Sequence, residues 1–245
     1  MIPSLPENRP DPKTAVLEAL ARLRAAFPLE ARLLTAAEPV RATYAQVLTH
    51  WLRATPPLTS AFDADALAAL VKLDAVVPEE HGIGCYPFST ADTGIRVTLP
   101  GGTVNAMCAI DALAVARLAR ARTRVDATCT ICGASIAFHV EENGGLDHDQ
   151  VEMARVIWQH AGTTHTSCSR GLCRRIRFLC RACPEAEELL LRLSPLGRLR
   201  VPHFRHPWRS PITGEHFTLP QAAAIGNAFF RFQSALLAAH AGPAT

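Results

Sequence analysis

The 245-residue sequence contains no apolar run of roughly 18 residues, the length that a membrane-spanning helix needs. Its N-terminal region also lacks the basic start, apolar run and small-residue cleavage site of a secretory signal. These absences predict a cytoplasmic protein without a membrane partner. About half of the residues are apolar, which is enough for one sizeable domain or two small ones.

The chain also lacks a strong excess of charge of either sign. Its formal net charge is only +3, which by itself does not indicate a nucleic-acid partner. Local basic runs occur at residues 117–124 and 173–178, and we interpret both as solvated faces. We therefore expect no nucleic-acid partner.

The sequence has no internal repeat and no low-complexity tract, and its apolar pattern changes once along the chain. Apolar residues recur at helical spacing over residues 13–26, 43–52 and 63–73. The last of these segments precedes an extended stretch, an order typical of a winged helix. We therefore predict a helical, winged-helix-like N-terminal domain over residues 1–84.

The second part mixes strands and helices. The stretch "GIRVTL" alternates apolar and polar residues before Pro-Gly-Gly, which indicates a strand and a tight turn. Further strands are predicted at residues 134–140, 156–160 and 174–179, and helices at residues 105–119, 184–193 and 220–240. The predicted fold class is α+β, in which residues 85–245 form a domain of antiparallel strands flanked by helices.

Eight cysteines make sulfur the prominent chemistry of this chain. In a reducing cytoplasm they should be thiols, thiolates or metal ligands rather than structural disulfides. They are Cys85, Cys108, Cys129, Cys132, Cys168, Cys173, Cys180 and Cys183.

The segment "NAMCAIDALAVARLA" places a thiol and a carboxylate at the start of an apolar helix. If Asn105 caps this helix, Cys108 lies in the first turn, where the helix dipole favours a thiolate. Asp111 is three residues further on and shares the helix face with Cys108. Its apolar neighbours should raise the pKa of the Asp111 carboxyl. The alternative is a small buried core cysteine beside an aspartate that only caps the helix.

Several motifs surround this helix start, within residues 63–230: "HGIGCYPFST", "GIRVTL", "AMCAIDALAVARL", "CTICGASIAFHV" and "GLCRRIRFLC". Their order and spacing resemble the alkylmercury lyase family. Within "AMCAID", Cys108 and Asp111 match the nucleophilic cysteine and its acidic partner. Cys173 matches the second active-site cysteine, and Cys129 matches a third that looks structural.

This resemblance implies protonolysis of a carbon–mercury bond, which yields a hydrocarbon and Hg(II) without an organic cofactor. Mercury is a soft ion that prefers thiolate ligands, so Cys108 and Cys173 would bind it. Asp111 would act as the acid and base. The product Hg(II) would pass to small thiols or to a mercuric reductase.

Additional cysteines depart from the family pattern. Cys129 and Cys132 form one C-x-x-C pair and Cys180 and Cys183 form another, and "CTICG" resembles a zinc-ribbon knuckle. The 47 residues between the pairs exceed the usual spacing of about 15 to 20. A structural zinc site, a set of thiols that relays mercury, and unligated cysteines all remain open.

A different class of function is also open. The chain could be a winged-helix regulator or sensor that binds a soft metal without turnover. Its presumed recognition segment, residues 63–77, carries one lysine and no arginine, which is little positive charge for phosphate contacts.

Overall fold

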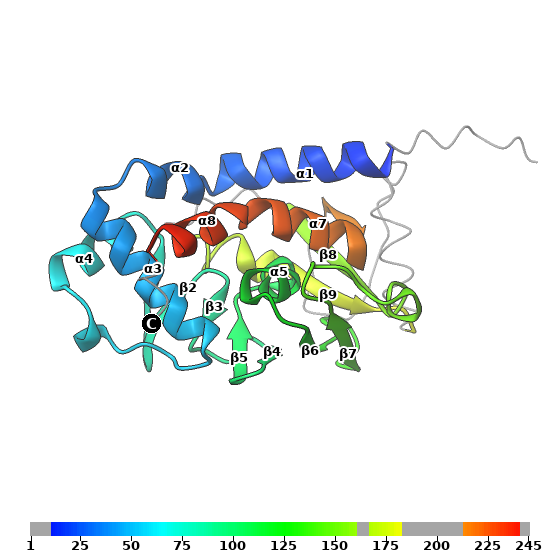
Figure 1. The fold of residues 1–245 in the computed structure, drawn as a ribbon. Coiled ribbons are helices and arrows are strands. Elements are labelled where there is room, and N and C mark those ends of the chain that lie inside the picture. The colour runs from blue at the N-terminus through cyan, green and yellow to red at the C-terminus, as the bar shows by residue number, and fades with distance from the viewer. Residues whose placement is uncertain (1–10, 161–166, 183–212, 241–245) are drawn as a thin grey trace, which may run out of the picture.

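A computed structural model describes residues 11–160, 167–182 and 213–240 of the chain. The N-terminal part is helical, as predicted, and consists of α1 (Pro12–Ala26), α2 (Leu29–Leu34), α3 (Glu38–Leu52), the 3-10 helix η1 (Thr59–Ala61) and α4 (Ala64–Lys72) (Figure 1). Aspartate caps begin two of these helices: Asp11 accepts hydrogen bonds from the first turn of α1, and Asp63 accepts one from Ala66 N at 2.8 Å.

A hairpin follows α4, formed by β1 (Val76–Glu79) and β2 (Gly82–Cys85). This order of helix and hairpin agrees with the predicted winged-helix-like shape. The hairpin is part of a seven-stranded antiparallel sheet in the order β1-β2-β3-β5-β4-β6-β7. The remaining strands are β3 (Phe88–Ser89), β4 (Ile95–Leu99), β5 (Gly102–Ala106), β6 (Thr123–Thr128) and β7 (Ser135–Val140).

The predicted α+β fold class is confirmed, including the strands at β4 and β7. The large sheet continues across residue 85, where the predicted domain boundary lies. A division into residues 1–84 and 85–245 remains a prediction.

A second, three-stranded antiparallel sheet has the order β10-β8-β9. Its strands are β8 (Ala154–His160), β9 (Ile176–Cys180) and β10 (Thr213–Thr218), with the 3-10 helices η2 (His148–Gln150) and η3 (Cys173–Arg175) before β8 and β9. The predicted strands at residues 156–160 and 174–179 correspond to β8 and β9. The helix predicted at residues 184–193 lies outside the described residues.

Two predicted helices need correction. The helix expected to start at residue 105 is α5 (Ala109–Ala119), because Asn105 belongs to β5, where it pairs with Arg96 on one side and Ser89 on the other. The single C-terminal helix expected over residues 220–240 is two helices, α7 (Leu219–Phe229) and α8 (Arg231–His240). Phe230 interrupts them, and the adjacent rings of Phe229 and Phe230 are both buried.

The helix α5 lies at the centre of the molecule. Its residues from Ala109 to Ala116 are all buried, because the sheet contacts one side and α7 contacts the other, with α1 beyond α7 (Figure 1). Gly226 allows the close contact between α7 and α5, since a Cβ there would lie 2.6 Å from the carbonyl oxygen of Ile110. The start of α5 is thereby held deep in the core.

None of the helices among the described residues combines the length and hydrophobicity that a membrane span requires.

Candidate active site

The first residue of the site is Cys108, which is the N-cap of α5. Its backbone is extended, and its Sγ accepts a hydrogen bond from Asp111 N at 3.4 Å. The thiol thus takes the capping position that the sequence analysis assigned to Asn105. The placement of Cys108 at the helix N-terminus is as predicted, although the capping residue was wrong.

Cys173, the third predicted site residue, lies close to the start of α5 although it belongs to a distant segment of the chain. Cys173 begins η3, immediately before β9, and its Sγ lies 3.8 Å from Asp111 Oδ2. The two sulfurs and a carboxylate oxygen of Asp111 all lie within 4.8 Å of one another. Cys108, Asp111 and Cys173 are 2%, 4% and 3% exposed, so the structure assembles the predicted trio in a nearly dry environment.

Burial controls the protonation of this cluster. It raises the pKa of Asp111 to about 7, against hydrogen bonds with Cys108 and Cys173 that lower it. This confirms the predicted direction for the carboxyl. Asp111 can therefore hold a proton near neutral pH.

The expected thiolate at Cys108 is not supported. Its pKa is raised well above the ordinary value, first by burial and then by interactions with Cys173 and Asp111. The helix N-terminus favours a thiolate, but removal of water outweighs it here. For Cys173, a hydrogen bond with Cys108 lowers the pKa, yet Cys168, burial and Asp111 together raise it well above the ordinary value. A soft cation would be needed to displace these thiol protons.

Cys168 was not among the predicted site residues, yet it lies beside one of them. Its Sγ lies 3.5 Å from Cys173 Sγ, and the turn between them is closed by a hydrogen bond from Cys173 N to Cys168 O at 3.0 Å. The five-residue spacing in "CSRGLC" was the available signal. This spacing alone does not predict a turn that brings the two sulfurs together.

Two polar residues outside the predicted set hold this turn in place. Asp74, between α4 and β1, accepts hydrogen bonds from Cys168 N at 2.8 Å and Ser167 Oγ at 2.9 Å. The hydroxyl of Tyr86 donates to Asp74 Oδ1 at 3.2 Å and accepts from Ser169 N at 2.8 Å. Asp74, just before the large sheet, and Tyr86, between β2 and β3, thus fix the loop that carries two of the thiols.

A small, mostly apolar pocket adjoins the cluster. Its walls come from α1, the segment around Tyr86, α5, the loop before β9 and the end of α7. The lining residues are Leu23, Phe27, Tyr86, Cys108, Ile110, Asp111, Cys168, Leu172, Cys173, Ile176, Phe229 and Phe230. Leu23 and Phe27 are themselves 4% and 2% exposed. The end of α1 and the residue after it therefore cover the site.

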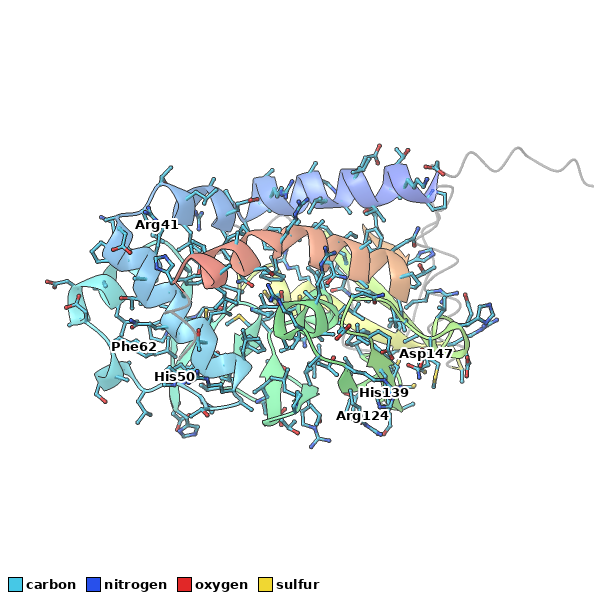
Figure 2. All side chains as sticks on the ribbon, in the orientation of Figure 1. Arg41, His50, Phe62, Arg124, His139 and Asp147 are labelled. Atoms are coloured by element: carbon cyan, nitrogen blue, oxygen red, sulfur yellow. The ribbon has the colours of Figure 1, made fainter. Side chains whose placement is uncertain are left out.

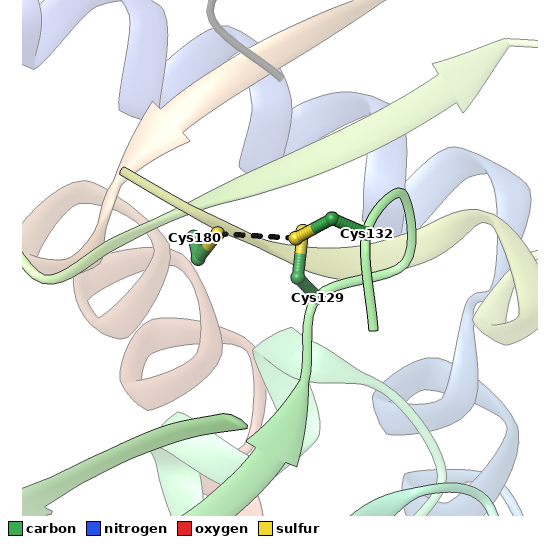
Figure 3. Close-up of side chains that lie close together, drawn as sticks. All are labelled: Cys129, Cys132 and Cys180. Carbon is green, nitrogen blue, oxygen red and sulfur yellow. Dashed lines mark hydrogen bonds between the residues drawn. The ribbon is translucent and has the colours of Figure 1, made fainter. Parts of the chain in front are cut away.

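A second group of cysteines lies apart from this pocket. Cys129, Cys132 and Cys180 bring their sulfurs within 4.8 Å of one another (Figure 3). The fourth member of the predicted quartet, Cys183, lies outside the described residues. The structure thus joins three of the four cysteines despite their unusual spacing in the sequence.

The basic run at residues 117–124 ends on an exposed face of the large sheet. Arg124 forms an ion pair with Asp126 at 2.9 Å and faces His139 on the neighbouring strand. Figure 2 shows Arg124 and His139 together on the side of the sheet away from the helices. This agrees with a solvated face.

Comparisons with known proteins address the family directly. The model of the MerB alkylmercury lyase family matches residues 88–188. A comparison with curated proteins gives no match. Among solved structures, the crystal structure of the mercury-bound form of MerB2 is similar with a TM-score of 0.60 and 20% identity, covering 87% of this chain and 99% of that chain.

At that identity the structural match shows a common fold, whereas the family match concerns the sequence itself. The matched segment contains Cys108, Asp111 and Cys173. Over residues 88–188 the chain is thus similar to the alkylmercury lyases, in agreement with the resemblance of its motifs.

Proposed function

We propose that the protein is an organomercurial lyase, which splits the carbon–mercury bond by protonolysis. The observation that carries this proposal is the contact of one buried carboxyl with two buried thiols, Asp111 with Cys108 and Cys173. Soft thiolates bind mercury, and a carboxyl with a pKa near neutral supplies a proton. The family match across these residues supports the same activity.

The reaction begins with capture of an organomercury thiolate, R–Hg–SR′. The sulfur of Cys108 bonds to mercury while R′S⁻ leaves with the Cys108 proton as R′SH. Cys173 then bonds to mercury, and its proton passes to the Asp111 carboxylate across the 3.8 Å contact. A mercury ion with two thiolates and one carbon ligand has a weakened carbon–mercury bond.

Asp111 then donates its proton to the leaving carbon. The electron pair of the carbon–mercury bond forms the new C–H bond, so the products are R–H and Hg(II) on two thiolates. The two thiol protons are accounted for by R′SH and R–H. The buried pocket excludes water, which keeps the proton on Asp111 and makes this residue the donor.

Several parts of the proposal concern the cell. The protein would act in the cytoplasm in mercury resistance, require no organic cofactor, and pass Hg(II) to small thiols or to a mercuric reductase. The transfer of Hg(II) is supported by the chemistry of the product, because a bis-thiolate mercury complex exchanges with other thiols.

Incubation of the purified protein with phenylmercury or methylmercury and excess small thiol tests the activity. Gas chromatography should detect benzene or methane accumulating over many turnovers. Hydrocarbon release no faster than in a protein-free control would refute the lyase proposal. Retained mercury without hydrocarbon, together with a low-salt gel shift of promoter DNA, would favour the regulator instead.

A further inference from the structure

We propose that Cys129, Cys132 and Cys180 form a second metal site, separate from the active site, that binds a thiophilic divalent ion through three thiolates. The ion is Zn²⁺ or Hg²⁺, which share this ligand chemistry. The proposal does not depend on the lyase activity, because none of these residues belongs to the cluster around Asp111.

The loop between β6 and β7 has the shape of a metal-binding knuckle. Residues 129–134 form a tight turn in which Cys129 N donates to Ala134 O at 2.8 Å and Gly133 N donates to Cys129 O at 2.9 Å. Gly133 has a φ of +73°, a conformation that favours glycine. This turn brings the sulfurs of Cys129 and Cys132 to one side, as a C-x-x-C-G metal knuckle requires.

The third sulfur, that of Cys180, reaches this turn from β9. Thr130 N donates to Phe178 O in β9 at 3.0 Å, which ties the knuckle to that strand. Cys180 is two residues further along, and its Sγ lies 3.6 Å from Cys132 Sγ (Figure 3). In a tetrahedral zinc–thiolate site with bonds of about 2.3 Å, neighbouring sulfurs are about 3.8 Å apart.

The three cysteines differ in their exposure to solvent. Cys129 and Cys180 are buried, at 2% and 7% exposed, whereas Cys132 is exposed. Core packing explains a buried cysteine but not an exposed one that turns toward two others. An ion on these three sulfurs would keep a remaining coordination position open to water or a small thiol.

Cysteines bind such an ion as thiolates, so binding to these three residues should release protons.

The two thiol clusters lie at opposite ends of β9. Cys173 comes shortly before the strand begins, and Cys180 is its last residue. Five strand residues span roughly 16 Å, which is too far for one ion to contact both clusters. Variants of one cluster can therefore be used as controls for the other.

The test uses full-length protein prepared under reducing, metal-free conditions and titrated with Zn²⁺ or Co²⁺ against a chromophoric chelator. We expect about one ion per chain and a thiolate-to-cobalt charge-transfer band. Cys132→Ser and Cys180→Ser should each weaken binding by roughly 100-fold or more. The matched control Cys108→Ser should bind zinc like the parent.

A thiol-protection experiment on the parent protein gives a second test that does not depend on whether the variants fold. Zinc should slow alkylation of Cys129, Cys132 and Cys180, located by peptide mass mapping, and leave Cys108 and Cys173 unprotected. Subsequent Hg²⁺ addition to zinc-loaded Cys108→Ser distinguishes the two ions: zinc release shows that mercury takes the same sulfurs, and zinc retention assigns the site to zinc. Absence of stoichiometric binding and of protection would overturn the proposal, whatever the lyase assay shows.

Discussion

Asp111 Oδ2 lies 3.8 Å from Cys173 Sγ, although 62 residues separate them in the chain. The helix α5 supplies the carboxyl and the loop before β9 supplies the thiol, and both are held inside the core. This contact gives Asp111 a proton source on one side and the metal-binding sulfurs as neighbours.

Replacing Asp111 should change how stability depends on pH. The pKa of Asp111 is about 7 in the folded protein and about 4 when unfolded, so the folded state holds the proton more tightly. Its contribution to stability is full below pH 4 and is lost as the pH rises to 7. Relative to Asp111→Asn, the parent should lose on the order of 4 kcal/mol of unfolding free energy across this window.

Urea unfolding of both proteins from pH 4 to 8 measures this difference. Asp65→Asn, at an exposed position on α4, is the control and should show a nearly constant difference from the parent. A flat difference for Asp111→Asn as well would mean that the carboxyl has an ordinary pKa in the folded protein.

Changing either active-site cysteine to serine should abolish turnover, but the two variants should differ in mercury capture. Cys108→Ser replaces a soft ligand at the helix cap with a hard hydroxyl, so capture of organomercury at the active site and cleavage should both be lost. Cys173→Ser should also abolish turnover, but Cys108 remains to capture R–Hg⁺. Mercury stoichiometry after gel filtration, measured beside hydrocarbon release, separates the two; normal release by either variant would show that the wrong thiol was assigned.

Asp74 should be a positioning residue for the active-site loop. Asp74→Asn has only one acceptor oxygen, so it cannot satisfy both Cys168 N and the hydroxyls of Ser167 and Tyr86. We expect a loss of about 1–3 kcal/mol in unfolding free energy and slower cleavage at a temperature where the protein is fully folded. The control Asp65→Asn makes the same chemical change on a solvent-exposed part of α4, so it should have little effect on unfolding free energy or cleavage rate. Equal behaviour of the two variants would contradict a positioning role for Asp74.

Helix α1, which covers the pocket, should affect both the stability of the protein and its choice of substrate. Leu23→Ala removes a buried wall of the pocket and should cost about 2–5 kcal/mol of unfolding free energy. Leu17→Ala, on the same helix but at a side chain 65% exposed, should change stability by less than about 0.5 kcal/mol.

The enlarged pocket of Leu23→Ala should also raise the ratio of phenylmercury to methylmercury cleavage in single-turnover assays. An unchanged ratio would show that α1 does not border the substrate.

Local pattern was enough to predict much of this molecule. The period of apolar residues located α1, α3 and α4, and alternation located β4 and β7. The motif "AMCAID" identified Cys108 and Asp111 because residues three apart at a helix start necessarily share a face. Cys173 was reached only through the family resemblance, because nothing local relates it to α5.

Other features depend on contacts that sequence pattern does not encode. Asn105 is a good helix cap by type, but pairing with β3 and β4 holds it in a strand and leaves the cap to Cys108. The helix dipole favours a Cys108 thiolate, yet burial on all sides of α5 reverses the balance. Asp74 supports the loop at Cys168 from 94 residues away, a relation that only the folded chain reveals.

The central claim is that Asp111 delivers the proton to carbon while sulfur holds the mercury. Its most direct test is single-turnover hydrocarbon release by Asp111→Asn, with mercury stoichiometry measured on the same samples. The account predicts that this variant binds organomercury and Hg(II) as the parent does, yet releases hydrocarbon slower by roughly 10²-fold or more. Release at the parental rate with mercury bound normally would show that the proton comes from another group, and would contradict the account.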